Sequence, residues 1–407
     1  MVIGLLAYHA ACNFGANLQL LSTFENIKKQ GHDPVVINWV PEDLNIYYVS
    51  RTKPVQYDVH KAFREKYLEM TGRCETENDI LREIEKYGIE AIIIGSDALL
   101  QHHSKLENIR PSLRKLFYFY KPTSDRLYPN PFWGSFMDDS RTIPSALMSV
   151  SSQDSRYQLF SRELKQQMKK SLQRFRYISV RDDWTQKMVM NITGDAIKPD
   201  VTPDPVFAFN QNAGHLVPSK DELLKKFGLS DNYILFSFLD NNTVDKEWLI
   251  RVDEIAKNKG YQCVALPFPH GLLFKSPFER NIDIPLSPMD WYALIKYSKG
   301  YVGHNMHPIV VSLHNAVPFY SFDNYGVVRL NGLIANEKSS KIYHLLNKAG
   351  FSEFRTPTIK RNFAVPAPEK VMNSLMTFDT GKEKEFSQFY YGQYQSMMEN
   401  ILKSIIL

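Results

Sequence analysis

The chain has 407 residues, which is too long for one ordinary hydrophobic core and suits two domains. Its composition, 43% hydrophobic and 23% charged, is that of a globular protein rather than a disordered one, and no segment approaches the roughly 18 apolar residues of a membrane span. The net charge of +5 is dispersed, which favours anionic small molecules as ligands over nucleic acid. The three widely spaced cysteines form no metal-binding framework and are typical of a protein in the reducing cytoplasm.

The first half of the chain alternates apolar runs with amphipathic segments, as in a parallel sheet covered by helices. Strands are expected at residues 2–8, 34–39, 91–94, 143–149 and 177–180. Helices are expected at 17–29, 77–87 and 161–175. The apolar N-terminus lacks a basic flank, which predicts a buried strand rather than a signal peptide. The long irregular stretch 98–139 is rich in proline, tyrosine and arginine, and we expect it to form an ordered loop that lines a site.

A linker at 210–218 precedes a second alternating pattern. Its strands are expected at 233–239, 262–267, 301–302 and 319–322, and its helices at 246–259, 290–298 and 309–315. The sequence therefore predicts an α/β protein with two doubly wound, Rossmann-like domains that face a cleft. We place the N-terminal domain at 1–214, the C-terminal domain at 215–345, and a helical tail that packs back on the body at 346–407.

The segment 300–322 is the most informative part of the chain. It reads as a short strand, a polar loop with two histidines, a short helix that Pro308 helps to begin, and a second strand. His307 therefore lies at a helix N-terminus and at the carboxyl end of a strand, where α/β proteins bind anions. His304 and Asn305 belong to the same expected site. The further ligands that a metal would need are absent from the segment, so we expect an anion site and no metal.

Two loops in the first half end at residues suited to ligand binding. Asn13, Gly15 and Asn17 precede the first helix, where small side chains and free N–H groups favour a bound ligand; a turn with a capping asparagine is the alternative. Ser96 and Asp97 follow the third strand. A carboxylate at this place can act as a general base or orient a sugar hydroxyl, and the alternative is a capping pair.

Three more positions are candidates. Arg181 follows the strand 177–180 and can bind a carboxylate or phosphate with two hydrogen bonds, although a surface ion pair is the competing interpretation. His270 lies in a loop after a strand of the second domain, where it either faces the cleft or is solvated. The Asp204–Pro205 pair reads as a turn with a structural role.

Taken in order, these motifs resemble the polysaccharide pyruvyl transferase family over roughly residues 1–350. The motifs are Asn-x-Gly-Ala-x-Leu-Gln at 13–19, Ile-Gly-Ser-Asp at 94–97, Ser-Val-Arg-Asp at 179–182, Asp-Pro-Val at 204–206 and the strand–histidine–helix element around His307. The resemblance implies a glycosyltransferase-B-like (GT-B-like) fold. It also implies transfer of pyruvate from phosphoenolpyruvate to two sugar hydroxyls, which forms a cyclic ketal on a cell-surface polysaccharide or its precursor.

The resemblance also implies roles and partners. Asp97, Arg181 and His307 fall on functional positions of the family: Arg181 and His307 would hold the donor, His307 would also donate a proton, and Asp97 would be the base or orient the acceptor. The N-terminal domain would bind the acceptor and the C-terminal domain the donor. The partners would be a small-molecule donor and a sugar or lipid-linked glycan, with no cofactor and no nucleic acid, in the cytoplasm with peripheral contact at the inner face of a membrane.

The chain departs from the family pattern at Asn305, where the family usually has arginine two residues before the histidine. Loss of a charge-assisted hydrogen bond costs about 1.5–3 kcal/mol, so the substitution predicts roughly ten- to a hundredfold weaker donor binding. His304 would replace this charge only when protonated. Two other functions stay open: a glycosyltransferase whose nucleotide-sugar ribose binds Asp323, and a non-catalytic glycan- or metabolite-binding relative.

Overall fold

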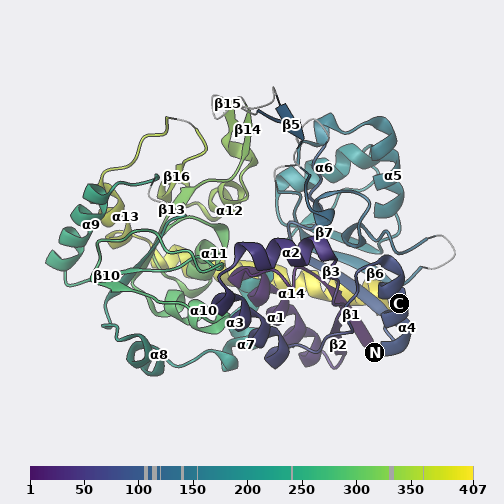
Figure 1. Ribbon diagram of the computed structural model, residues 1–407, viewed down its shortest axis with the longest axis horizontal. Helices are drawn as coiled ribbons and strands as arrows, with labels where there is room; N and C mark the ends of the chain where they lie inside the picture. Colours follow the sequence, from purple (N-terminus) through teal and green to yellow (C-terminus); the bar gives the residue numbers. More distant parts are fainter. Residues whose placement is uncertain are drawn as a thin grey trace.

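The computed structural model describes residues 1–104, 109–111, 117–119, 121–138, 142–153, 155–239, 242–329, 334–360 and 362–406. Two six-stranded parallel sheets organise the chain, one in each half (Figure 1). The first sheet has the order β2 (Asp33–Val36), β1 (Val2–Leu6), β3 (Ala91–Asp97), β6 (Ser145–Val150), β7 (Tyr177–Val180) and β8 (Asp200–Val201). The second has the order β11 (Arg280–Asn281), β10 (Gln262–Ala265), β9 (Tyr233–Ser237), β12 (Gly300–Gly303), β13 (Phe319–Asp323) and β16 (Arg355–Pro357).

Helices pack around both sheets. In the first half they are α1 (Phe14–Lys29), α2 (Glu42–Arg51), α3 (Pro54–Tyr67), α4 (Glu77–Tyr87), α5 (Arg162–Leu172) and α6 (Asp183–Thr193). A short helix, α7 (Phe209–Ala213), leads to α8 (Lys220–Phe227), α9 (Lys246–Asn258), α10 (Pro288–Tyr297), α11 (Met306–Asn315), α12 (Lys341–Ala349) and α13 (Pro368–Met376). Central strands are apolar along their length, and Ile92, Ile93 and Ile94 of β3 are fully buried, because helices cover both faces of the sheet. The expected doubly wound fold is confirmed.

The helical C-terminal tail that the sequence predicts is present, with α13 and the last helix of the chain. The region also contains the short strand β16, which pairs in parallel with β13 and completes the second sheet. Helix α13 packs on α9 of the same domain. Only the last helix, α14 (Thr380–Ile406), leaves the second domain; it crosses to the first, where it contacts β3, β6 and β7 and ends near the N-terminus (Figure 1). A three-residue strand is too short to show the alternating pattern that reveals strands in a sequence.

Buried contacts join the two domains. Helix α1 packs against α10 and α11, and Phe14 at its start lies between the rings of His60 and Trp291. The side chain of Gln56 exchanges two hydrogen bonds with the backbone of Leu286, at 2.7 and 2.9 Å. These contacts hold the two domains against each other. None of the described helices has the length and apolar character to cross a membrane.

The buried carboxyl of Glu383 on α14 predicts a pH-dependent cost to stability. Its side chain is 0% exposed, and neither carboxyl oxygen has a hydrogen-bond partner among the described residues. Burial raises its pKa from 4.5 to about 10, so at neutral pH the folded chain holds a proton that the unfolded chain releases. The free energy of unfolding is therefore highest, as far as Glu383 is concerned, below pH 4.5, and it falls as the pH rises toward 10.

We expect Glu383→Gln to raise the free energy of unfolding by about 1–3 kcal/mol near neutral pH, because glutamine cannot ionise in the unfolded chain. Urea unfolding at about pH 4 and about pH 7.5 checks this, since the gain should nearly vanish at the lower pH. An equal gain at both pH values would show that ionisation is not the cause.

Candidate active site

The carboxyl ends of the two sheets face a cavity of about 550 Å³ between the domains. The first domain contributes the loop after β1, helix α2 and the end of β3, and the second contributes the loop at 267–270, the start of α11, Tyr325 and Lys341. Parallel strands of doubly wound sheets place ligand sites at this edge. The sequence-predicted residues that line the cavity are Asn13, Gly15, Asp97, His270, Asn305 and His307.

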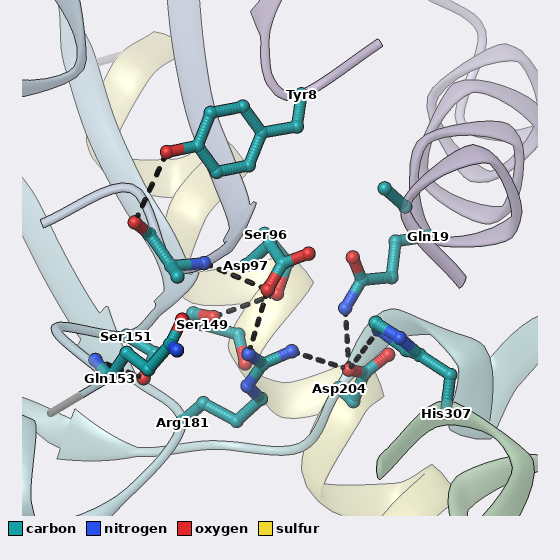
Figure 2. Close-up of polar contacts among 12 residues, drawn as sticks. Tyr8, Gln19, Ser96, Asp97, Ser149, Ser151, Gln153, Arg181, Asp204 and His307 are labelled. Carbon is teal, nitrogen blue, oxygen red and sulfur yellow. Dashed lines mark hydrogen bonds and ion pairs between the residues drawn. The ribbon is translucent and has the colours of Figure 1, made fainter. Parts of the chain in front are cut away.

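A chain of charged groups leads from Asp97, which lines the cavity, through Arg181 to Asp204 (Figure 2). The Arg181 guanidinium lies between two carboxylates, with Nη2 3.0 Å from Asp97 Oδ1 and Nη1 2.8 Å from Asp204 Oδ2. Gln19 on α1 donates from Nε2 to the same Asp204 oxygen at 2.5 Å. Asp204 is held further by the backbone N–H of Val206. Asp97 lines the cavity, whereas Arg181 and Asp204 line a smaller pocket of about 190 Å³ behind it.

The ion pairs fix the protonation states of these groups. Burial disfavours the charged form of Asp97, but the positive charges of Arg181 and Lys341 outweigh burial and hold the pKa of Asp97 well below its usual range. Burial also disfavours charged Arg181, and the carboxylates of Asp97, Asp204 and Asp182 outweigh it and raise the pKa of Arg181. Asp97 therefore reaches the cavity as a carboxylate with one oxygen already engaged.

His307 lies in the first turn of α11, where its ring lines the cavity. Its Nε2 is 3.9 Å from Asp204 Oδ2, beyond hydrogen-bond distance, and neither ring nitrogen has a hydrogen-bond partner among the described residues. Burial lowers the pKa of His307, and the carboxylates of Asp97 and Asp204 oppose this only in part. The imidazole is therefore neutral near pH 7, and its Nε2 is buried without a hydrogen-bond partner in the described part of the chain.

Gly15 explains how His307 is held. A Cβ atom on Gly15 would lie 2.0 Å from Cγ of the His307 ring, so only glycine lets the first turn of α1 pack flat against the imidazole. Asn13 caps this helix by accepting from the Ala16 N–H at 3.3 Å, and it also lines the cavity. Gly15, whose small size in the sequence favoured a bound ligand, thus makes room for the His307 side chain of the second domain.

Lys341 supplies a positive charge that the sequence analysis missed. It is the first residue of α12, only 8% exposed, and lines the cavity. Its Nζ lies 4.4 Å from the centre of the Tyr325 ring, and it has no hydrogen bond or ion pair among the described residues. Burial and the charge of Arg181 lower the pKa of Lys341, and the carboxylates of Asp97, Asp182 and Asp204 oppose this only in part. A buried ammonium without a carboxylate partner favours binding of an anion.

Lys341 is positioned by Asp323, which the sequence offered as a ligand for a nucleotide ribose. The structure corrects that interpretation: Asp323 is fully buried, and its Oδ2 accepts from Ser340 Oγ at 2.5 Å and from Arg355 Nε at 2.6 Å. Ser340 in turn caps α12 by accepting from the N–H groups of Ile342 and Tyr343. Asp323 therefore fixes the start of the helix that carries Lys341.

Three predicted substrate-binding residues use their side chains inside the protein. Asn17 pairs with His60, Ser96 donates to the Ser149 carbonyl at 2.7 Å, and His304 accepts from the Leu239 N–H at 2.9 Å. His304 is therefore not the replacement for the missing arginine. Arg181, expected to hold the donor, is instead enclosed by its two carboxylates.

The network contains two residues beyond the predicted set. Asp204 reads in the sequence as a turn, yet its carboxylate links Arg181 to the surroundings of His307 (Figure 2). Gln19 is the last residue of the motif at 13–19, and its place in that motif was the only feature of the sequence that pointed to a role in the network. No group of three or more metal-binding side chains occurs in the described part of the chain.

Two facing Rossmann-like sheets with a cavity between them define a protein of the GT-B structural class. A family model for polysaccharide pyruvyl transferases matches residues 13–325, more than three quarters of the chain. The chain therefore belongs to the polysaccharide pyruvyl transferase family. A comparison with curated proteins found no match.

Solved structures support the fold. The chain is similar to the UDP-GlcNAc 2-epimerase from Neisseria meningitidis bound to UDP-GlcNAc, with TM-score 0.53, 10% identity and coverage of 99% of each chain. It is also similar to the putative UDP-N-acetylglucosamine 2-epimerase from Listeria monocytogenes, with TM-score 0.51, 10% identity, and coverage of 95% of this chain and 90% of that one. A ugt transferase from Siraitia grosvenorii in complex with UDP gives TM-score 0.50 at 10% identity over 100% of both chains. At this identity the likeness concerns the fold alone.

The contact between Gly15 and His307 predicts opposite effects for two glycine-to-alanine changes. Gly15→Ala should cost about 1–3 kcal/mol of unfolding free energy, because the new methyl group overlaps the imidazole. Gly392→Ala is the matched control on α14, where no atom lies within 4 Å of the added Cβ; it should stabilise by about 0.5–1 kcal/mol. Urea unfolding of both variants checks this, and a neutral Gly15→Ala would contradict the contact.

Proposed function

We propose that the protein transfers pyruvate from phosphoenolpyruvate to two hydroxyls of a sugar and forms a cyclic ketal. Membership of the family supports the reaction class. The observation that carries the donor assignment is the buried, unpaired ammonium of Lys341 beside the neutral ring of His307. Lys341 replaces the positive charge whose absence at Asn305 argued against an anionic donor.

The donor fits the wall made by the second domain. Phosphoenolpyruvate carries a carboxylate and a phosphate, and both need positive partners or N–H donors. Lys341 and the N-terminus of α11 offer these on neighbouring elements. Asn305 lines the same wall, and its Oδ1 accepts from the Tyr325 hydroxyl at 3.2 Å, which links it to the ring beneath Lys341.

The acceptor fits the wall made by the first domain. Tyr8, Tyr47 and Tyr48 line this side with Asp97 and Asn13. Aromatic rings offer apolar faces for a sugar, and the carboxylate and amide orient its hydroxyls. Because the pKa of Asp97 is held low, its main role is to accept a hydrogen bond from the attacking hydroxyl.

The chemistry then proceeds in two steps. Protonated His307 donates a proton to the methylene carbon of the donor. The first hydroxyl, oriented by its hydrogen bond to Asp97, bonds through its oxygen to the adjacent carbon, and its proton passes to an oxygen of the donor phosphate. The second hydroxyl then bonds to the same carbon as the bond between that carbon and the phosphate oxygen breaks. Its proton returns to His307, and the first hydroxyl proton leaves with the phosphate. Arg181 is a positioning residue in this scheme, because its two carboxylates hold it away from the reacting atoms.

Replacement of Lys341 by methionine should weaken phosphoenolpyruvate binding roughly ten- to a hundredfold, because one charge-assisted contact is lost. Methionine keeps the volume, so the fold should persist. Lys338→Met is the matched control, since Lys338 is exposed three residues earlier. Calorimetric titration measures both variants. Equal affinities in Lys341→Met and wild type would remove Lys341 from the donor site.

Donor binding should be accompanied by proton uptake near pH 7. The pKa of His307 is lowered in the free protein, and a bound anion favours its charged form and raises that pKa. Calorimetry in buffers of different ionisation enthalpy measures the uptake, which His307→Gln should abolish together with turnover. The proposed proton donor would be contradicted by unchanged uptake or unchanged turnover in that variant.

A further inference from the structure

A second cavity, of about 240 Å³, lies beside the acceptor wall and is formed by the first domain alone. Its lining includes His9, Asn38, Tyr48, Lys61, Arg64 and Arg73. Tyr48 also lines the active-site cavity, so the two cavities share a wall. The second cavity is too small for a whole oligosaccharide and suits one substituent or one sugar residue.

Arg64 on α3 is the unusual residue of this cavity. It is only 6% exposed, and its Nη1 is buried without a hydrogen-bond partner. Its guanidinium makes no ion pair or hydrogen bond with any residue in the described ranges, although the charge of the neighbouring Glu65 acts on it at longer range. Buried arginines are ordinarily paired, because an isolated charge costs several kcal/mol to desolvate.

The other basic residues of the cavity are already paired. Lys61 lies 3.7 Å from Glu65 Oε1, and Arg73 lies 3.0 Å from Glu75 Oε1 and also donates to the Val40 carbonyl. Glu65, the acidic residue of the lining, is more than half exposed and faces Lys61. The unmatched charge in the cavity therefore belongs to Arg64.

We propose that this cavity binds an anionic substituent of the acceptor glycan, a carboxylate or a phosphate, with Arg64 as its partner. The planar guanidinium matches either group with two parallel hydrogen bonds. The assignment to the acceptor rests on the proposed transfer reaction and on position: the cavity adjoins the first-domain wall, whereas Lys341 and α11 lie on the second domain. The substituent would belong to the sugar that is modified or to its neighbour in the glycan.

Calorimetric titrations of simple glycosides test the proposal. Methyl glucuronide, methyl glucoside 6-phosphate and neutral methyl glucoside serve as probes, and Lys341→Met protein serves as host, so that binding of anions at the donor site is weakened. We expect at least one charged glycoside to bind roughly tenfold or more tightly than the neutral one. The charged glycoside that binds better identifies the substituent as carboxylate or phosphate.

Adding Arg64→Met to the host should cancel this preference, and Lys66→Met, an exposed lysine on the same helix, should preserve it. Arg64→Lys should keep part of it, because the charge remains without the paired geometry. The fold should tolerate Arg64→Met, since no internal partner is left unpaired. Charged glycosides that bind no better than the neutral one, or a preference that survives Arg64→Met, would overturn the proposal. Failure of phosphoenolpyruvate to bind the wild-type protein would refute the donor assignment and leave these titrations valid.

Discussion

The buried ion pairs of Arg181 with Asp97 and Asp204 hold the active-site side of the structure together. Asp97 comes from the end of β3, Arg181 follows β7, and Asp204 follows β8, so the pairs tie together three strands of one sheet. Gln19 adds helix α1 to the same cluster (Figure 2). Removing one member of such a cluster leaves a buried charge without its partner, which typically costs about 3–5 kcal/mol. Loss of Arg181 would therefore affect the fold as well as the site.

The same cluster sets the electrostatics of the cavity. The carboxylates of Asp97, Asp204 and Asp182 outnumber the guanidinium of Arg181, and the ammonium of Lys341 offsets part of the remaining negative charge while His307 stays neutral. An anionic donor upsets this balance, and protonation of His307 restores part of it. Donor binding and protonation of His307 are therefore coupled. A fixed arginine at position 305 would have weakened this coupling, because its charge would hold the pKa of His307 lower.

Much of the fold was predictable because parallel strands buried on both faces leave continuous apolar runs. His307 and Asp97 were predictable for a related reason: each follows such a run, and the carboxyl ends of the strands meet at one edge. Lys341 and Arg64 were not, since each acquires its role from burial and from the absence of a partner. Both properties arise from tertiary packing, and neither leaves a local pattern. Asp204 was read as a turn because Asp-Pro pairs are common in turns.

A crystal structure of the protein with phosphoenolpyruvate is the most direct test of the donor site. We predict that one anionic group of the donor lies about 2.7–3.2 Å from Lys341 Nζ and that its methylene carbon faces the His307 ring. Donor bound through Arg181, with its ion pairs to Asp97 and Asp204 broken and Lys341 turned away, would contradict this assignment.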